Sequence, residues 1–267
     1  MLYFIKLGGS LITNKNKPHR ARARVIARLA AEMAEARRLD PDLQIVIGHG
    51  SGSFGHVAGN KYHTRQGVHT PAEWLGFSEV WQAARALNQI VAEALFKASL
   101  PVIAFPPSAA ILAQNGQVTR WDIQPIRAAL SAGLIPLVNG DVAFDTLLGG
   151  TILSTEDLFG YLARLLRPQR ILLAGLEKGV WADYPICRQL INTITPQSYP
   201  GLAGSLEGSA AIDVTGGMAE KVKSMLALVE QVPGTQALVF SGNQPGQVRQ
   251  ALLGGVPGTL IVQALSE

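Results

Sequence analysis

Cysteine is almost absent from this chain of 267 residues, which contains Cys187 and no other. A single thiol cannot form an internal disulfide or a cysteine-rich metal site, so the cross-linked frameworks of small secreted domains are excluded. The first residues also lack the basic segment and apolar stretch of a secretory signal, because Lys6 interrupts the first apolar run. We therefore expect a protein of the reducing cytoplasm.

Long apolar runs are missing as well. The longest charge-free region, around 99–118, contains three prolines and the pair Asn115-Gly116. Prolines and an Asn-Gly pair would break a helix long before it could cross a bilayer. We therefore expect no membrane partner.

Charged residues are few, at 16% of the chain, whereas apolar residues make up 48%. This balance is typical of a compact globular protein with a large core. The formal net charge of +4 is mild and fits anionic small molecules as well as nucleic acid. Because much of the excess lies on lysines and arginines between residues 15 and 28, we interpret it as an exposed helix face and expect no nucleic acid partner.

Patterns typical of strands and helices alternate along the chain. Strands are predicted at 2–7, 43–47, 101–105, 135–139, 170–174, 236–240 and 259–262, and helices at 20–38, 77–98, 123–132, 155–166 and 217–231. This alternation predicts a mainly parallel sheet with helices on both faces. Asn115-Gly116 and Gly149-Gly150 each indicate a hairpin, and residues 57–71 are predicted to be irregular.

Two glycine-rich loops each follow a predicted strand. The first is Gly8-Gly9-Ser10, and the second spans residues 48–55 with four glycines. Glycine lets the backbone approach a ligand closely, and a helix that starts in such a loop directs free N–H groups toward an anion. The two loops therefore predict one site that binds two phosphorylated groups.

Other glycine-rich nucleotide sites fit the chain less well. Residues 50–55 match the G-x-G-x-x-G pattern of dinucleotide sites, but they follow the second strand and no acidic residue ends a later strand at the required distance. Glu73 has roughly the right spacing but lies in a segment predicted as a loop. A Walker-type loop is excluded because no Gly-Lys-Ser/Thr follows the glycines.

Lysines flank the first loop on both sides. Lys6 interrupts an apolar strand, where a buried ammonium requires an anion or a carboxylate. Lys15 follows the same loop, so the two lysines could offset the charge on a transferred phosphoryl group. The alternative, a paired Lys6 and a surface Lys15, stays open. A third loop, 213–218, opens a helix that carries Lys221 and would suit the phosphates of a nucleotide.

These motifs, at residues 6–15, 49–56, 140–142 and 215–221, together resemble the amino acid kinase superfamily and, within it, the isopentenyl phosphate kinases. The resemblance implies a homodimeric three-layer αβα sandwich with a mainly parallel central sheet. Residues 1–150 would form an acceptor-binding lobe and residues 151–267 a nucleotide-binding lobe. The implied reaction is the phosphorylation of isopentenyl phosphate to isopentenyl diphosphate with ATP and Mg²⁺, and the sequence assigns no residue as a ligand to the metal.

The resemblance also implies a role for each matching residue. His56 would bind the acceptor phosphate, Ser51 and Gly140 would line the acceptor site, and Lys6 and Lys15 would be catalytic. The residues implied for ATP are Lys6, Gly8, Gly9, Ser10, Gly52, Asp157, Gly179, Gly217 and Lys221. The chain departs from the family pattern at Ser51, where glycine or alanine is usual, and at Lys178, where the family tends to be acidic.

A histidine beside a glycine-rich anion loop favours an acceptor that is itself a phosphate, because imidazole can be protonated near neutral pH. A structural histidine that binds loop carbonyls is the alternative for His56. A prenyl tail would need apolar contacts, and candidates that could equally be ordinary core are Val80, Trp81, Ala84, Leu87, Ile111 and Trp121. A kinase for another small phosphate or phosphonate, and a regulator that binds nucleotide or oxyanion without catalysis, also remain open.

Overall fold

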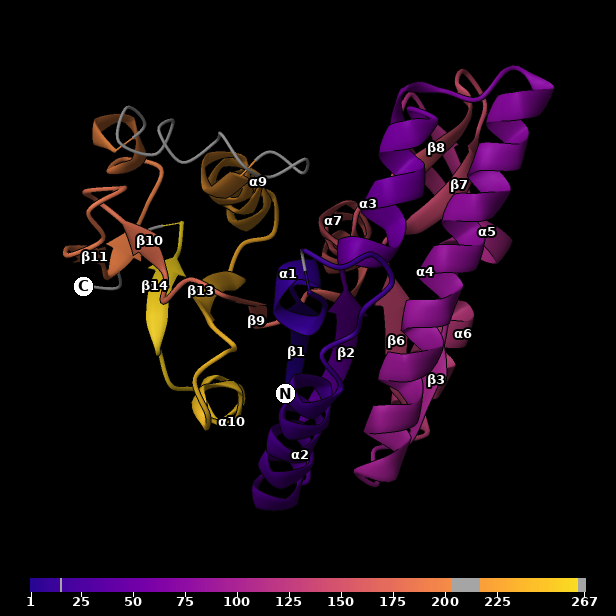
Figure 1. The fold of residues 1–267 in the computed structure, drawn as a ribbon. Helices are drawn as coiled ribbons and strands as arrows, with labels where there is room; N and C mark the ends of the chain where they lie inside the picture. Colours follow the sequence, from indigo (N-terminus) through magenta and orange to yellow (C-terminus); the bar gives the residue numbers. More distant parts are fainter. Residues whose placement is uncertain (15, 203–216, 264–267) are drawn as a thin grey trace.

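The computed structural model of the chain describes residues 1–14, 16–202 and 217–263 (Figure 1). Its central feature is an eight-stranded sheet with the strand order β12-β14-β13-β9-β1-β2-β6-β3. The strands are β1 (Leu2–Leu7), β2 (Gln44–His49), β3 (Val102–Ala104), β6 (Ile135–Asn139), β9 (Arg170–Gly175), β12 (Thr193–Ile194), β13 (Gln236–Ser241) and β14 (Gly258–Ile261). All neighbours pair in parallel except β13 with β14, which confirms the predicted mainly parallel sheet.

The central strands are buried on both faces. In β1, residues 3–5 and Leu7 are buried, and Lys6 is the one charged residue of the strand. Continuous apolar runs are typical of parallel strands that helices cover on both sides. The lysine at such a position must meet an opposite charge or an anionic ligand.

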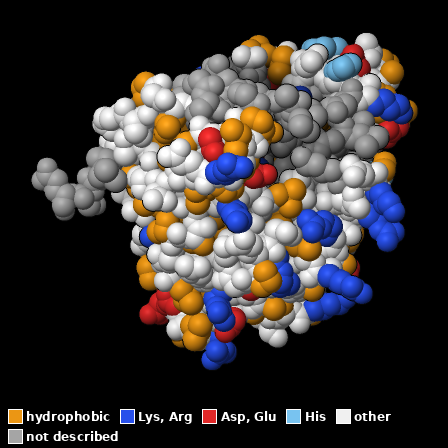
Figure 2. All heavy atoms as spheres, turned by 60° about the vertical axis from the view of Figure 1, so that its left-hand side comes forward, with side chains coloured by type: hydrophobic (Ala, Val, Ile, Leu, Met, Phe, Trp, Pro, Cys, Tyr) orange, Lys and Arg blue, Asp and Glu red, His pale blue; other side chains and the backbone are white. Residues whose placement is uncertain are grey.

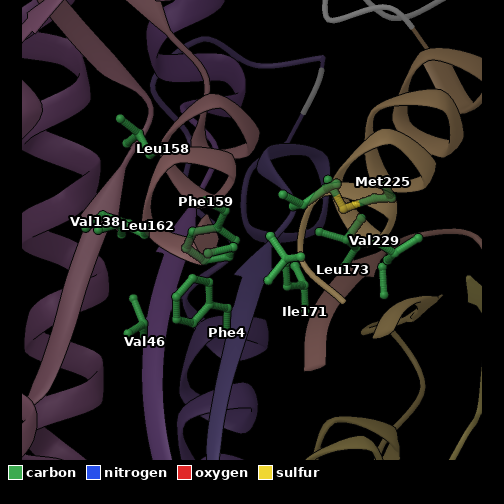
Figure 3. Packing of buried hydrophobic residues seen from close by; sticks show 14 of the residues in the cluster. Phe4, Val46, Val138, Leu158, Phe159, Leu162, Ile171, Leu173, Met225 and Val229 are labelled. Carbon is green, nitrogen blue, oxygen red and sulfur yellow. The ribbon is translucent and has the colours of Figure 1, made fainter. Parts of the chain in front are cut away.

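Helices cover both faces of the sheet and complete the predicted three-layer αβα sandwich. One face carries α2 (Ala23–Leu39), α4 (Pro71–Lys97) and α10 (Gln247–Leu252), and the other carries α6 (Gln124–Ser131), α7 (Thr155–Leu166) and α9 (Gly217–Gln231). Figure 3 shows the second of these cores, where Phe4 of β1 lies against Phe159 of α7 with ring centroids 5.1 Å apart. Met225 of α9 belongs to the same cluster.

A second, four-stranded sheet lies beside the first and has the order β5-β4-β7-β8. It consists of β4 (Ile111–Gln114), β5 (Gln117–Trp121), β7 (Asp141–Asp145) and β8 (Gly149–Leu153). The two predicted hairpins are confirmed, but the sequence did not predict that they join through parallel pairing of β4 with β7. The Asp145 carboxylate links their turns, because it accepts backbone N–H groups from Asn115, Gly116, Leu147 and Leu148.

The region predicted to be irregular, 57–71, is partly helical, since it contains the end of α3, the 3-10 turn Thr64–Gln66 and the first residue of α4. Helix α3 spans Gly52–Lys61, so the second glycine loop passes directly into a helix. Helix α4 begins at Pro71, six residues before the predicted start at Phe77. Glu73 therefore lies in the first turn of a helix rather than in a loop, and it forms a capping box with Thr70.

The surface carries charges of both signs. Lysine and arginine side chains are spread over the face drawn in Figure 2, among acidic and apolar side chains. Within the described ranges, no helix combines the length and the apolar character that crossing a bilayer requires.

Candidate active site

Four neighbouring strands end in register, and each end coincides with a glycine. Leu7 of β1 pairs with His49 of β2 and with Ala174 of β9, and His49 pairs in turn with Asn139 of β6. The next residues along the chain are Gly8, Gly50, Gly140 and Gly175. This row lies at the carboxyl edge of the sheet. From β1 the chain adds β2 on one side and β9 on the other, so the strand order reverses here. Ligands of open α/β sheets bind at such a switch point.

A cavity of about 510 Å³ opens above this row of glycines. Its wall includes most of the residues that the sequence singled out: Lys6, Gly8, Gly9, Ser10, Ser51, Gly52, Gly140, Gly217 and Lys221. Gly50 and Gly175 also line it, although they were not assigned a role from the sequence. The alignment of the strand ends in the sheet would have indicated both glycines.

The two glycine loops touch each other through their backbones. A Cβ atom on Gly9 would lie 2.6 Å from the amide nitrogen of Gly52, and one on Gly50 would lie 3.0 Å from the amide nitrogen of Gly9. Gly52 itself has a φ of +48°, which favours glycine. Any side chain at these positions would push the loops apart, so glycine is required for their contact.

The hydroxyl of Thr13 fastens the two loops together. Thr13 follows the short helix α1 (Gly9–Ile12), and its Oγ1 donates a hydrogen bond to the Gly9 carbonyl at 2.7 Å. The same oxygen accepts the backbone N–H of Ser53, in the first turn of α3, at 3.0 Å. The N-terminus of α3 is thus held against the first loop, and the first N–H groups of a helix have no intrahelical partner and can bind an anion.

Lys6 forms an ion pair with Glu156, the second residue of α7. Burial alone would raise the pKa of Glu156, but the positive charges of Lys6 and Lys221 outweigh it and hold this pKa below its ordinary value. The pairing that the sequence left open for Lys6 therefore exists, and Lys6 lines the cavity as well. Glu156 had no site role predicted from the sequence, whereas its neighbour Asp157 did.

Two residues implied for ATP do not belong to the described wall of the cavity. Asp157 caps α7, since its Oδ2 accepts the Ser154 N–H at 2.7 Å. Gly179 packs against Thr259, whose Oγ1 would lie 2.6 Å from a Cβ atom at that position. A nucleotide role for either residue stays a prediction.

Three further predictions concern parts of the chain that the structure does not describe. Lys15 and the loop residues 213–216 lie outside the described ranges. His56 is part of helix α3, but its side chain is outside the described set. The roles expected for Lys15 and His56 therefore stay predictions.

The end of the cavity beside α4 and β8 is apolar in part. Val80 and Ala84 of α4 line it together with Ile152 and Leu153 of β8. Of the other candidates for contact with a prenyl tail, Leu87, Ile111 and Trp121 are buried in the core clusters and do not line the cavity. The helical apolar stripe thus serves both the core and the cavity.

Asp141 adds a carboxyl group to the same end of the cavity, directly after Gly140. Burial raises the pKa of Asp141 to about 6, although hydrogen bonds from the Val142 amide and the Ser108 hydroxyl oppose the shift. The sequence placed this residue in a motif without giving it a role.

The opposite end of the cavity is aromatic. Trp181 and Tyr184, in or near the short strand β10 (Val180–Trp181), line it beside Leu176. The indole Nε1 of Trp181 donates a hydrogen bond to Glu177 Oε2 at 3.0 Å, which fixes the plane of the ring. Aromatic rings of this kind can stack on a nucleotide base. The short strands here carried no recognisable sequence signal.

Touching glycine loops, a partly buried lysine and a helix N-terminus at the switch point of a parallel sheet define a site for phosphoryl transfer. The comparisons with known proteins agree. The family model described as "Amino acid kinase family" matches residues 1–241, and the chain belongs to this family.

Several curated relatives share nearly their full length with this chain. It is 31% identical to the isopentenyl phosphate kinase of Methanocaldococcus jannaschii, over 98% of both proteins. It is 33% identical to that of Haloferax volcanii, over 97% of this chain and 98% of the relative. A crystal structure of isopentenyl phosphate kinase superimposes with a TM-score of 0.82 at 30% identity, covering 98% of this chain and 100% of that one.

The contact between the loops leads to a prediction about Gly9. Gly9→Ala would bring a Cβ atom within 2.7 Å of two backbone atoms of Gly52, so it should destabilise the fold by about 1–3 kcal/mol. Gly175→Ala is the matched control, because it also lies at the cavity and a Cβ there would meet nothing within 4 Å. Denaturant unfolding of both variants measures the difference, and equal stability would contradict the close contact.

Proposed function

We propose that the protein transfers the γ-phosphoryl group of ATP to isopentenyl phosphate and so forms isopentenyl diphosphate. The observation that carries this proposal is the contact between Gly9 and Gly52, which joins an acceptor end and a nucleotide end within one cavity beside Lys6. The relatives that cover nearly the whole chain are isopentenyl phosphate kinases, which supports the same acceptor.

The chemistry needs little more than position and charge. An oxygen of the acceptor phosphate attacks the γ-phosphorus in line, the bond from that phosphorus to the β–γ bridging oxygen breaks, and ADP leaves. No general base is required, because the acceptor oxygen is already anionic. Lys6 and Lys15 stabilise the charge on the transferring oxygens, and Glu156 keeps the Lys6 ammonium in place.

The two substrates bind at opposite ends of the cavity. Residues 1–150 supply most of the acceptor end, where Ser51, His56 and Gly140 bind the phosphate and the tail lies along Val80 and Ile152. Residues 151–267 supply the nucleotide end. There Gly217 and Lys221 bind the ATP phosphates, and Trp181 and Tyr184 lie beside the base.

ATP is expected to bring Mg²⁺ with it. Mg²⁺ usually binds substrate phosphates and waters with one or two carboxylates, rather than a protein cage. Three carboxylates line the cavity, those of Asp141, Glu156 and Glu177, and hard oxygen ligands of this kind fit the ion. Bound there, Mg²⁺ would neutralise part of the charge of the phosphates.

A cytoplasmic homodimer completes the proposal, with the single cysteine supporting the cytoplasm. Strand β3 ends the eight-stranded sheet, and the side chains of Ile103 and Ala104 on it are exposed. Phe96, near the end of α4, is 73% exposed. An exposed apolar sheet edge favours pairing with a second copy. Light scattering should give twice the mass of the chain, and a monomer at assay concentration would contradict the dimer.

The direct test is a transfer assay. The protein, incubated with ATP, Mg²⁺ and isopentenyl phosphate, should release ADP and form a diphosphate in equal amounts. ADP release without a diphosphate, or no ADP at all, would contradict the proposed reaction. Small polar phosphates and phosphonates serve as controls for the acceptor, because the apolar end should favour the prenyl tail. Faster transfer to one of these would favour the alternative kinase.

His56 distinguishes a phosphate acceptor from other acceptors. A charge-assisted hydrogen bond contributes enough that His56→Ala should weaken acceptor binding by about 10–150-fold and leave ATP binding nearly unchanged. Because the imidazolium is the better donor to phosphate, acceptor affinity of the parent protein should fall as the pH rises through a histidine pKa, ordinarily about 6.5.

Calorimetric titrations of the parent, His56→Ala and the exposed-histidine control His69→Ala at two pH values would test this. Unchanged acceptor affinity in His56→Ala would make His56 structural.

A further inference from the structure

A hydrogen-bonded network of three side chains lies beneath the acceptor end of the cavity. His49 and Asn139 are register partners at the ends of β2 and β6, and both are buried. The alternation along each strand places them on the face that α4 covers. Asn88 of α4 lies between them: its Nδ2 is 3.1 Å from His49 Nε2 and 2.9 Å from Asn139 Oδ1.

Each strand-end side chain of this network also binds a backbone carbonyl. His49 Nδ1 lies 3.1 Å from the carbonyl oxygen of Gly50, and Asn139 Nδ2 donates to the carbonyl oxygen of Gly140 at 3.2 Å. Gly50 and Gly140 line the cavity, whereas the three side chains do not belong to its described wall. The carbonyls of both glycines are therefore held by groups outside the cavity.

The protonation state of His49 fits this arrangement. Burial lowers the pKa of His49 to about 4, the Gly50 carbonyl opposes the shift, and the charge of Lys6 adds to it. A neutral imidazole has one donor and one acceptor. With the proton on Nδ1, the ring donates to Gly50 and accepts from Asn88, so both ring nitrogens of His49 have a partner.

Carbonyl orientation matters in a site for an anion. A glycine loop binds phosphate through its N–H groups, and a carbonyl oxygen turned toward the same anion would repel it. Glycine has no side chain to limit rotation of its peptide planes, so something else must fix them. The backbone adds two further bonds here, because the His49 carbonyl accepts both the Gly140 N–H at 3.1 Å and the Thr155 hydroxyl at 2.7 Å.

We propose that Asn88 is a positioning residue for the acceptor phosphate. By joining His49 to Asn139, it holds the carbonyl oxygens of Gly50 and Gly140 away from the cavity, where they would repel the acceptor phosphate. This proposal rests on the proposed function, since it concerns how the phosphorylated acceptor is held. Asn88 touches neither substrate, and its effect passes through the two glycines.

The test is the variant Asn88→Leu, which has a similar volume but no donor. It should raise the KM for isopentenyl phosphate by about tenfold, as expected when two net hydrogen bonds no longer support the site. The KM for ATP should stay unchanged. Gln89→Leu is the matched control, because it removes an exposed amide from the same helix. That amide donates a hydrogen bond to Glu93 at 2.8 Å, away from the cavity. Both KM values should remain at the parent level in this control.

A merely structural role would lower the unfolding free energy and change the two KM values alike, and this outcome would overturn the proposal. An unchanged acceptor KM would overturn it too. Asn88→Asp provides a second variant if Asn88→Leu does not fold, since it has nearly the same shape but its carboxylate cannot donate to Asn139. It should also raise the acceptor KM selectively.

The two proposals can fail separately. If the parent protein transfers no phosphoryl group to isopentenyl phosphate, the proposed function fails. The network is then tested with inorganic phosphate as the probe, by calorimetry. Weaker phosphate binding to Asn88→Leu than to the parent and Gln89→Leu would support the positioning role, and equal binding of all three would overturn it.

Discussion

The site depends on backbone contact between two glycine loops at the ends of neighbouring parallel strands. The register of β1 with β2 aligns Leu7 with His49, so Gly8 and Gly50 come side by side. With no side chain between them, the loops approach until Gly9 nearly touches Gly52, and Thr13 fastens the contact. Two anions bound by these loops are held close together although they repel each other. The proximity that phosphoryl transfer needs is thus built into the sheet before any substrate arrives.

A second constraint is the buried charge of Lys6. An ammonium in an apolar strand costs several kcal/mol unless an opposite charge meets it, and Glu156 provides that charge. The pair keeps the lysine extended into the cavity rather than folded toward solvent. When a phosphoryl group enters, Lys6 can stabilise it while Glu156 still limits its motion.

Much of this arrangement could be predicted from local sequence patterns, and the rest depends on tertiary contacts. Residues 2–10 show in sequence alone a buried strand, a lysine and a glycine loop, because each signal spans only a few residues. Glu156 and Asp157 are adjacent, and only the rotation of α7 decides that Glu156 faces Lys6 while Asp157 caps the helix. The pairing of β4 with β7 and the bonds from Asn88 to His49 and Asn139 join segments 30 or more residues apart, and no local pattern records them.

The distribution of charge along the cavity separates binding from catalysis. Burial shifts the pKa values of His49 and Asp141 in opposite directions, to about 4 and about 6, so that near neutral pH His49 is neutral while Asp141 is still mostly ionised. At the end of the cavity that α4 and β8 line, backbone dipoles and the Arg65 guanidinium are available to a phosphate, besides the predicted His56. The positive charge of Lys6 lies where the loops touch. Dipoles that hold the acceptor act equally before and during transfer, whereas a charge at the point of transfer acts most on the transition state, and only such an interaction raises turnover.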